Sequence, residues 1–363
     1  MPAVTASFYR KSQAARKIIV VDLGFLGDTV HLLAPLREIK RNDPQAALHV
    51  MSTPVGCEVL AMAPWVNQAW SLEMSKQKRT LRQQWRVLKA VRREQFDLAF
   101  NFSAADRTLF MTALTGARWR ISYAGGRPHF WKKWLMSDWM MPDPSPAPNF
   151  ERRRQMLAAC GLSLEPARFD LDPGKTAQQW AAQNVPAGAV HFSLNASTHL
   201  KEWPLEHWIQ LARLLCKNHP NLRIIATASG KPRELTRLRA FAAALPEIPL
   251  QTLAELSIPA LTALLTQCSL HVGCDSGVLH LAVACGVPTV SLFRKYSGVQ
   301  GWLPTGSKNI SLMVDCICAG RRSAPCEEFE TAKCLATLLP SAVLEAVDNA
   351  THHRFGFVPD AKP

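Results

Sequence analysis

The stretch that decides the fold is Lys17-Ile-Ile-Val-Val-Asp-Leu-Gly24-Phe-Leu-Gly27-Asp28-Thr-Val30. It opens with a short run of β-branched residues, which is typical of a buried parallel strand. Two glycines and an aspartate follow, and apolar residues then recur at helical spacing as far as Ile39. The stretch therefore predicts a strand, a glycine turn and a helix, which is the repeating unit of an open α/β sheet.

The same alternation continues on both sides of the proline-rich segment Met141-Pro-Asp-Pro-Ser-Pro-Ala-Pro148 and the loose stretch 163–188. Further strands are expected at residues 48–51, 96–102, 189–194, 222–226, 270–273 and 289–293. Further helices are expected at 79–93, 151–160, 205–218, 233–244, 258–267 and 277–284. We therefore predict an α/β protein with two Rossmann-like doubly wound domains. The predicted parts are an N-terminal domain (1–165), a linker (166–187), a C-terminal domain (188–345) and a tail (346–363).

Length and composition fit this organisation, because 363 residues are more than a single core usually serves. The residues are 48% hydrophobic and 19% charged, which excludes a disordered chain. No apolar run approaches the roughly 18 residues that span a bilayer, and we find no signal-peptide core, so we expect a cytoplasmic protein. The ten cysteines are then expected to be reduced thiols or ligands rather than disulfides.

Positive charge is concentrated in one part of the sequence. The chain carries a net charge of +14, and the segment from Lys76 to Arg154 holds 17 lysines and arginines against 6 acidic residues. Such a field attracts nucleic acid, anionic lipid or a phosphorylated glycan. A solvated helix face would explain residues 76–93 alone, but the continuation to Arg154 favours a partner. Aromatic, methionine and lysine residues in Phe130–Met141 fit either a core helix or an interfacial membrane contact, and we favour the contact.

The turn after the first strand contains the first group of candidate site residues. Ligands of open parallel sheets bind at the carboxyl ends of strands, where this turn lies. Its glycines allow another molecule to approach the backbone closely. Asp28 has two interpretations that position alone leaves open: a helix N-cap, or a general base that takes a proton from a hydroxyl. The turn does not match Gly-x-Gly-x-x-Gly, which argues against a dehydrogenase.

Two further groups follow later strands. The loop 193–204 offers small hydroxyl residues and Lys201, which suit a diphosphate, although an ordinary loop with a surface lysine would look the same. Asp275-Ser276-Gly277 leads a strand into a helix whose amino end suits a phosphate. Asp275 can hold sugar hydroxyls. His280 either faces the same site or is a core histidine.

Taken together, these blocks resemble glycosyltransferase family 9, the heptosyltransferases that build the inner core of lipopolysaccharide. The resemblance extends from about Lys17 to about Val347 and includes Thr115-Gly-Ala-Arg118, Lys201-Glu-Trp-Pro204 and Asp275–Pro288. It implies a GT-B fold, in which two domains face each other across a cleft. It also implies an inverting, metal-independent transfer from a nucleotide sugar, with ADP-heptose as the expected donor and no cofactor.

The resemblance also implies roles for individual residues. Asp28 matches the proposed catalytic base and Lys201 the lysine near the donor phosphates. The expected donor-binding residues are Ser197, Glu234, Asp275, Ser276, Gly277 and His280. For the anionic lipid-linked acceptor we predict contacts with Gly27 and Arg120. We expect the protein to bind peripherally to the cytoplasmic face of the inner membrane.

The sequence departs from the family pattern at two places. Ser276 replaces the usual threonine, and Phe293-Arg294-Lys295-Tyr296 stands where members commonly have Phe-Gly-Pro-Thr. These departures leave two alternatives: a family 9-like transferase that uses another nucleotide sugar for capsule, glycan or protein glycosylation, and a non-catalytic sugar-nucleotide binder. The basic stretch suggests a third, a nucleic-acid-binding protein. No recognition motif supports the last of these.

Two patterns resemble metal sites. We attribute Asp170-Leu-Asp172 to chance, because it lies in the predicted linker and the family does not use metal. A cysteine cluster has the ligand type for zinc or iron but lacks a Cys-x-x-Cys pair, so reduced thiols are favoured. Its members are Cys316, Cys318, Cys326 and Cys334.

Overall fold

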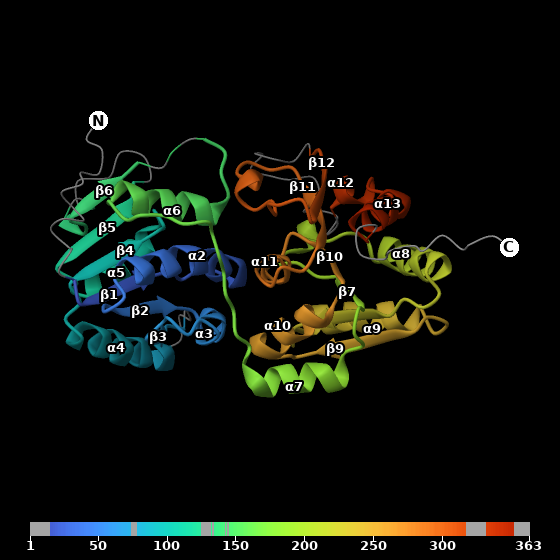
Figure 1. The fold of residues 1–363 in the computed structure, drawn as a ribbon, viewed down its shortest axis with the longest axis horizontal. Helices are drawn as coiled ribbons and strands as arrows, with labels where there is room; N and C mark the ends of the chain where they lie inside the picture. Colours follow the sequence, from blue (N-terminus) through green and yellow to red (C-terminus); the bar gives the residue numbers. More distant parts are fainter. Residues whose placement is uncertain are drawn as a thin grey trace. The chain divides into compact units, whose positions relative to one another are not determined.

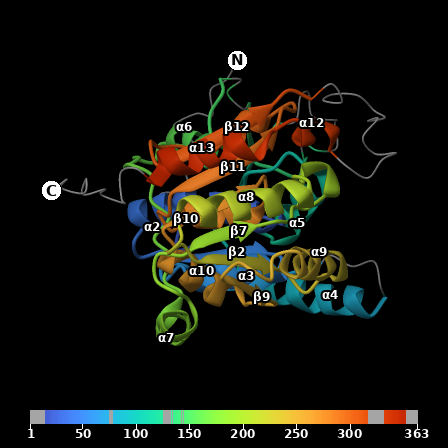
Figure 2. The ribbon, with the colours of Figure 1, turned by 90° about the vertical axis from the view of Figure 1, so that its right-hand side faces the viewer.

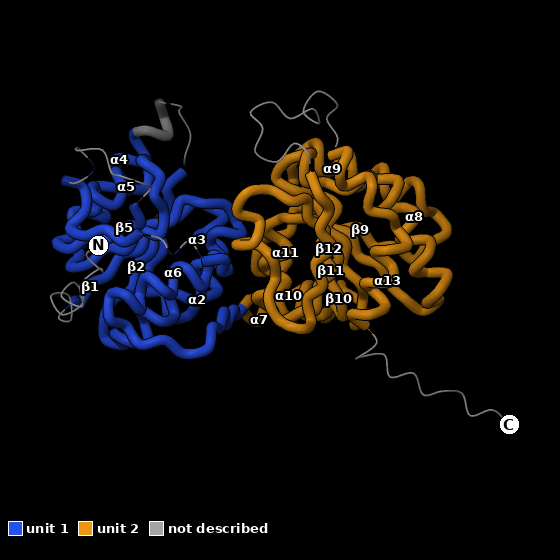
Figure 3. Tube along the Cα trace, turned by 90° about the horizontal axis from the view of Figure 1, so that it is seen from above, with its two compact units in different colours: residues 1–172 blue, residues 173–363 orange. Residues whose placement is uncertain are grey.

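The computed structural model describes residues 15–73, 78–124, 132, 134–141, 143, 145–316 and 332–351. The chain divides into two compact units, residues 1–172 and 173–363 (Figure 3). Each unit contains a six-stranded parallel sheet with helices on both faces, as the repeating pattern of the sequence predicts (Figure 1). Among the described residues, every helix is too short or too polar to span a bilayer.

The sheet of unit 1 has the strand order β3-β2-β1-β4-β5-β6. Its strands are β1 (Lys17–Val21), β2 (Ala47–Ser52), β3 (Gln68–Ser71), β4 (Leu98–Asn101), β5 (Trp119–Tyr123) and β6 (Asp138–Met140). Its helices are α2 (Leu26–Asn42), α3 (Pro54–Ala61), α4 (Lys78–Arg93), α5 (Asp106–Leu114) and α6 (Asn149–Ala159).

Strand β1 shows how the sheet builds two cores. Successive side chains of a strand point to opposite faces, so Ile18 and Val20 pack with α2 and α6 on one face. Ile19 and Val21 pack on the other face with Leu88 and Val91 of α4. Because both faces are covered, the strand is apolar throughout, which is the pattern that the sequence shows.

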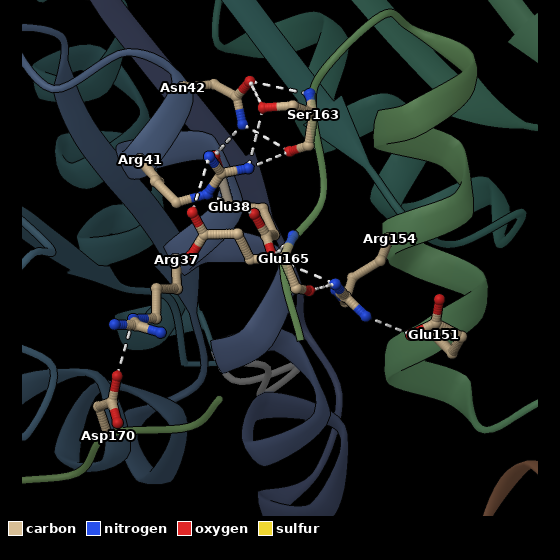
Figure 4. Close-up of polar contacts among 9 residues, drawn as sticks. All are labelled: Arg37, Glu38, Arg41, Asn42, Glu151, Arg154, Ser163, Glu165 and Asp170. Carbon is tan, nitrogen blue, oxygen red and sulfur yellow. Dashed lines mark hydrogen bonds and ion pairs between the residues drawn. The ribbon is translucent and has the colours of Figure 1, made fainter. Parts of the chain in front are cut away.

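A polar network fixes α2 against α6 and the segment that follows it (Figure 4). Arg154 of α6 pairs with Glu38 of α2 at 3.2 Å, and both side chains are buried. Around this pair, Asn42 bonds to Ser163, and Arg37 pairs with Asp170 at 2.7 Å. The Asp-x-Asp pattern thus supplies an ion-pair partner for α2, and Asp170 is not part of a metal-binding group within the described residues.

Unit 2 has the sheet order β12-β11-β10-β7-β8-β9, which is the same winding as in unit 1. Its strands are β7 (Val190–Ser193), β8 (Ile224–Ala228), β9 (Leu250–Ala254), β10 (Leu270–Cys274), β11 (Thr289–Arg294) and β12 (Asn309–Val314). Its helices are α7 (Gly174–Asn184), α8 (Leu205–Asn218), α9 (Pro232–Ala243), α10 (Ile258–Gln267), α11 (Gly277–Ala284), α12 (Lys333–Ala336) and α13 (Pro340–Thr351), with 3₁₀ turns at η2 (His199–Lys201) and η3 (Val299–Gly301).

Large apolar side chains fill the core on the α8 side of this sheet. Phe192 of β7, Trp208 of α8 and Phe241 of α9 are fully buried there. Helix α13 packs on α8 and on the sheet (Figure 2, with α8 and α13 in front). Trp203 is also fully buried, and its indole N–H donates to the carbonyl oxygen of Leu338 at 2.9 Å.

The structure differs from the predictions in several segments, among them the predicted linker and the aromatic segment. Helix α7 occupies residues 174–184, where the sequence predicts a loose linker, and it packs against α10. Its only buried side chain is Ala181, so its apolar periodicity is weak. In the aromatic segment, residues 138–140 form strand β6 beside β5 rather than a core helix, while Phe130 and Trp131 lie outside the described residues.

Candidate active site

Each sheet reverses its winding at its centre, between β1 and β4 in unit 1 and between β7 and β10 in unit 2. Ligands of open α/β sheets bind outside the carboxyl ends of the strands at such a switch point. The residues that the sequence singles out follow these strands. Asp28 comes after β1, Lys201 after β7, and Asp275 directly after β10.

In unit 1, Asp28 lies in a group of charged side chains. It is the third residue of α2, and its Oδ2 accepts the N–H of Phe25, the residue that caps the helix, at 2.9 Å. Arg153 of α6 lies on the other side, with Nη2 at 3.8 Å from Oδ1 of Asp28 and 3.1 Å from Oδ2 of Asp22. The side chain of Asp28 keeps 27% of its surface exposed, against 8% for Asp22. Asp28 is thus the more accessible carboxylate of the two.

The surroundings of Asp28 shift its proton affinity. Burial and, second, the negative charge of Asp22 raise the pKa of Asp28, while the Arg153 guanidinium and the Phe25 N–H oppose the rise. A raised pKa makes a carboxylate a better proton acceptor. The N-cap is Phe25 rather than Asp28, and Asp28 contributes to the capping from the third position of the helix through Oδ2. Its role as a general base stays a prediction.

Gly24 is required by the position of the Asp28 side chain. A Cβ at residue 24 would lie 2.4 Å from Cβ of Asp28, which is closer than such atoms approach. Gly24 also donates its N–H to Oδ1 of Asp22 at 2.9 Å. The turn therefore needs a glycine at residue 24 because Asp28 folds back over it.

In unit 2, Lys201 and Asp275 form an ion pair at the ends of β7 and β10. The Nζ–Oδ2 distance is 2.7 Å, and the side chains are 25% and 8% exposed. The phenol of Tyr296 donates to the same carboxylate oxygen at 2.9 Å. The Lys201 ammonium also lies 5.2 Å from the centre of the Tyr296 ring, within the range of a cation–π interaction.

The loop that carries Lys201 is fixed by the buried carboxylate of Glu202, which pairs with the exposed side chain of Arg233. Glu202 accepts the N–H of Ala196 at 2.9 Å and pairs with Arg233 of α9 at 2.5 Å. Arg233 also donates to the carbonyl oxygen of Ala196. The backbone N–H of Trp203 donates to Sγ of Cys274 on β10. These contacts place Lys201 beside the end of β10, and those of the carboxylate explain why glutamate follows it.

Polar groups without protein partners occur beside this pair. Ser276, the N-cap of α11, makes no capping hydrogen bond, and its hydroxyl is a buried group without a partner in the structure. The same is true of both amide atoms of Asn195, a residue only 6% exposed that follows β7. A buried polar group without a partner is costly unless a ligand or water satisfies it. Together with the amino end of α11, these groups suit an anionic ligand.

His280 lies beneath this region as a neutral side chain. It is 5% exposed, and its ring packs 5.3 Å from that of Trp302. Burial lowers the pKa of His280 to about 4, with the Asp275 charge opposing the shift and the Lys201 charge adding to it. The imidazole therefore stays uncharged at neutral pH and contributes no positive charge toward a phosphate.

A model of glycosyltransferase family 9 (heptosyltransferase) matches residues 84–331. The chain belongs to this family. The lipopolysaccharide core heptosyltransferase OpsX of Haemophilus influenzae is 21% identical over 291 residues, which are 80% of this chain and 82% of the relative. Lipopolysaccharide heptosyltransferase 1 of Pseudomonas aeruginosa is 23% identical over 292 residues, 76% of this chain and 78% of the relative.

Solved structures agree with the fold. The E. coli heptosyltransferase WaaC with ADP-2-deoxy-2-fluoro heptose superposes with a TM-score of 0.72 at 16% identity, covering 92% of this chain and 99% of WaaC. The fold is therefore GT-B, with one Rossmann-like sheet in each unit, and the protein is a glycosyltransferase. The resemblance read from the sequence is thereby confirmed for family, fold and enzyme class.

The other predicted site residues of this glycosyltransferase have varied surroundings. Glu234 is buried and accepts both the N–H and the hydroxyl of Ser229, so it closes the loop after β8. Ser197 is exposed in the loop that Glu202 holds, whereas Gly27 is buried in the first turn of α2. The guanidinium of Arg120 donates to the carbonyl oxygens of Leu135 and Ala117, so it joins the segment before β6 to the segment before β5.

Sequence reasoning missed three members of these groups. Asp22 looked like the last residue of a strand, and Arg153 like one cation in a basic stretch. Tyr296 was singled out only because its segment departs from the family pattern. In the predicted cysteine cluster, Cys318 and Cys326 lie outside the described residues, and no group of three metal-binding side chains occurs in the part that the structure covers.

Proposed function

We propose that this enzyme transfers heptose from ADP-heptose to an anionic lipopolysaccharide core acceptor. The heptosyltransferase relatives act on lipopolysaccharide by name, and the solved relative carries an ADP-heptose analogue. The observation that carries the proposal is the chemistry of the two strand-end groups. Unit 1 presents the Asp28 carboxylate, whose pKa is raised. Unit 2 presents Lys201 and the amino end of α11, which suit a diphosphate, and the carboxylate of Asp275, which suits sugar hydroxyls.

The proposed reaction is a single displacement. Oδ1 of Asp28 takes the proton of an acceptor hydroxyl, whose oxygen attacks the anomeric carbon of the heptose. The bond from that carbon to the β-phosphate oxygen breaks, and its electron pair leaves with ADP. Attack opposite the leaving group inverts the anomeric configuration. Lys201 and the amino end of α11 stabilise the negative charge that grows on the diphosphate. In a metal-independent transfer, protein groups must provide this stabilisation.

Recognition of the donor follows from the same groups. Asp275 would accept hydroxyls of the heptose, and Ser276, Gly277 and Ser197 would donate to the diphosphate. Glu234 would accept a ribose hydroxyl with the oxygen that now faces Lys231 at 3.5 Å. His280 would support the pocket as a neutral group. In unit 1, Arg120 and Gly27 stay the proposed acceptor contacts.

We further propose that unit 1 contacts an anionic membrane surface through the α4 basic face, defined as Arg82, Arg86, Lys89, Arg92 and Arg93. All five side chains are exposed, and no ion pair joins them to any described acidic residue. Trp85, in the same helix, is 65% exposed. Beside it is a cavity of about 440 Å³ that Leu88 and Leu114 help to line. Unpaired cations around an exposed tryptophan suit anionic lipid head groups better than nucleic acid, because the ring can enter the interface.

The reaction is tested with purified protein, ADP-heptose and a heptose-deficient lipopolysaccharide acceptor, by measuring ADP release and the anomeric configuration of the product. Asp28→Asn keeps the size of the side chain but removes the base. We expect turnover to fall about a hundredfold or more while ADP affinity in unit 2 stays unchanged. A preference for another nucleotide sugar would contradict the donor, and an active Asp28→Asn enzyme would contradict the base.

A further inference from the structure

Tyr296 touches both members of the ion pair in unit 2. It lies two residues beyond β11, whose neighbour β10 ends beside Asp275. Its hydroxyl donates to Oδ2 of Asp275 at 2.9 Å, and the Lys201 ammonium lies 5.2 Å from the centre of its ring. Tyr296 stands in the segment Phe293–Tyr296, where the sequence departs from the family pattern described above.

The three side chains meet at one oxygen. Lys201 and Tyr296 both bond to Oδ2 of Asp275, at 2.7 and 2.9 Å. No hydrogen bond from a described residue reaches Oδ1. Two bonds on one oxygen fix the plane of a carboxylate and leave the other oxygen for a ligand. Asp275 is therefore oriented by its partners, not only by its own position in the turn.

The Lys201 ammonium cannot neutralise Asp275 and bind the donor diphosphate at the same time. It now neutralises Asp275, which is only 7% exposed. If the ammonium moves to the donor diphosphate, a buried carboxylate loses its counter-charge, which is costly. The Tyr296 hydroxyl can keep its bond to Oδ2 during that move. Burial and the charge of Asp275 raise the pKa of the Tyr296 phenol, so the hydroxyl remains a donor.

We propose that Tyr296 is a positioning residue of the donor site: it holds Asp275 so that Oδ1 faces a hydroxyl of the donor sugar, and it holds Lys201 over its ring until the diphosphate binds. This proposal rests on the proposed function, because it takes Lys201 and Asp275 as donor-binding residues. It predicts that Tyr296 acts on the sugar through Asp275 and on the diphosphate through Lys201. The two effects are separable, because ADP lacks the heptose whose hydroxyls Asp275 is proposed to accept.

Two substitutions separate these effects. Tyr296→Phe removes the hydroxyl but keeps the ring beneath Lys201 and its packing beside Phe293, Val299 and Trp302. We expect a rise of roughly tenfold in KM for ADP-heptose, with the Kd of ADP unchanged. Tyr296→Leu also removes the ring, and we expect it to change the Kd of ADP as well. Tyr123→Phe makes the same chemical change in unit 1 and should leave both constants unchanged.

A double-variant cycle tests whether Tyr296 acts through Asp275. If it does, Tyr296→Phe added to Asp275→Asn has no further effect on KM for ADP-heptose, because the oriented carboxylate is already gone. Independent, additive effects would overturn the proposal, as would equal changes of ADP-heptose KM and ADP Kd in Tyr296→Phe. If the wild-type protein neither binds ADP nor uses ADP-heptose, the proposed function fails. If the wild type does both and Tyr296→Phe matches it, only the role of Tyr296 fails.

Discussion

Arg153 binds the backbone of Asp28 as well as facing its side chain. The guanidinium Nη1 donates to the carbonyl oxygen of Asp28 at 2.7 Å, while Nη2 lies between the carboxylates of Asp28 and Asp22. Helix α6 thereby fixes the first turn of α2, 125 residues away in sequence. The same cation also limits how far the pKa of Asp28 can rise.

Replacing Arg153 with Gln should move the acidic limb of the pH–activity profile. The Arg153 charge lowers the pKa of Asp28, whereas burial and Asp22 raise it, so removing the charge leaves only the raising effects from these groups. A base with a higher pKa loses its free carboxylate at higher pH, and the limb of kcat/KM should move upward. Arg153→Lys keeps the charge and should move it less. A limb that stays in place, or moves to lower pH, would show that Asp28 is not the group that titrates.

Replacing Gly24 with Ala should lower kcat without changing donor affinity. The added Cβ would clash with Asp28 at 2.4 Å, so the carboxylate must shift. Displacing a catalytic group by about 1 Å can cost on the order of a hundredfold in rate. ADP binding, measured by calorimetry, is the internal control because its proposed site lies in unit 2. A variant with normal kcat would mean that the position of Asp28 does not limit the reaction.

The protein should lose stability as the pH falls below 6.5. Burial lowers the pKa of His191 to about 3 and of His280 to about 4, and it lowers the pKa of His271 well below the usual value. The unfolded chain binds these protons near pH 6.5, so the stability is complete above that pH and is lost as the pH falls toward 4. Each histidine removes about 1.4 kcal/mol per pH unit in this window.

Denaturant unfolding of unit 2, followed by its buried tryptophans at pH 7.5, 6 and 5, measures this slope. Replacing His191 with Gln should reduce the slope by about one proton, even if it lowers stability at every pH, because His191 bonds to His271 and Thr227. Equal stability at pH 7 and pH 5 would contradict the burial of neutral histidines.

Replacing Glu202 with Gln should weaken donor binding and lower stability together. The carboxylate is 7% exposed and joins the N–H of Ala196 to Arg233, whose side chain is 44% exposed, so the variant removes the buried charged acceptor that ties the loop to α9. We expect a loss of about 1–3 kcal/mol in unfolding free energy and a higher Kd for ADP. Glu247→Gln breaks an exposed pair with Arg213 by the same chemical change and should cost much less, because solvent screens exposed pairs. Equal losses in both variants would mean that Glu202 does not hold the loop.

Neutralising the α4 basic face should reduce membrane binding but not transfer to a short soluble acceptor. We expect Arg82, Arg86, Lys89 and Arg93 changed together to Gln to lower co-sedimentation with phosphatidylglycerol vesicles, since each cation contributes about 1 kcal/mol near an anionic surface. The control changes Lys217, Arg223, Arg239 and Lys308, four exposed cations of unit 2. Equal losses in the two variants would contradict a specific face, and tighter binding to RNA than to vesicles would favour a nucleic-acid partner.

Elements with a clear apolar period could be predicted from the sequence. The expected bounds of 205–218, 258–267 and 277–284 are those of α8, α10 and α11. Strands β3 and β9 lie at the edges of their sheets and are partly exposed, so they lack the continuous apolar run of a central strand. They were not predicted. The positions of Asp28, Lys201 and Asp275 after strands could be predicted from the family motifs. A turn that follows a strand depends on residues that are adjacent in the sequence.

Contacts between distant segments could not be predicted in the same way. Nothing near Arg153 indicates that it reaches Asp28, and nothing near Tyr296 indicates that its hydroxyl reaches Asp275, 21 residues earlier. Such pairs depend on which strands are neighbours, so they follow from the winding of the sheet rather than from a local pattern. For the same reason, Asp28, Lys201 and Asp275 could be identified from the sequence, whereas the side chains that orient them could not.

The identical winding of the two sheets has a consequence for how such an enzyme can diversify. The loop after the first strand of each sheet occupies the same topological position, yet it supplies a carboxylate in unit 1 and an ammonium in unit 2. Each sheet has its own core, so a loop in one unit can be replaced without repacking the other. Under the proposed function, donor and acceptor preferences can thus evolve by separate routes, because we assign them to different units.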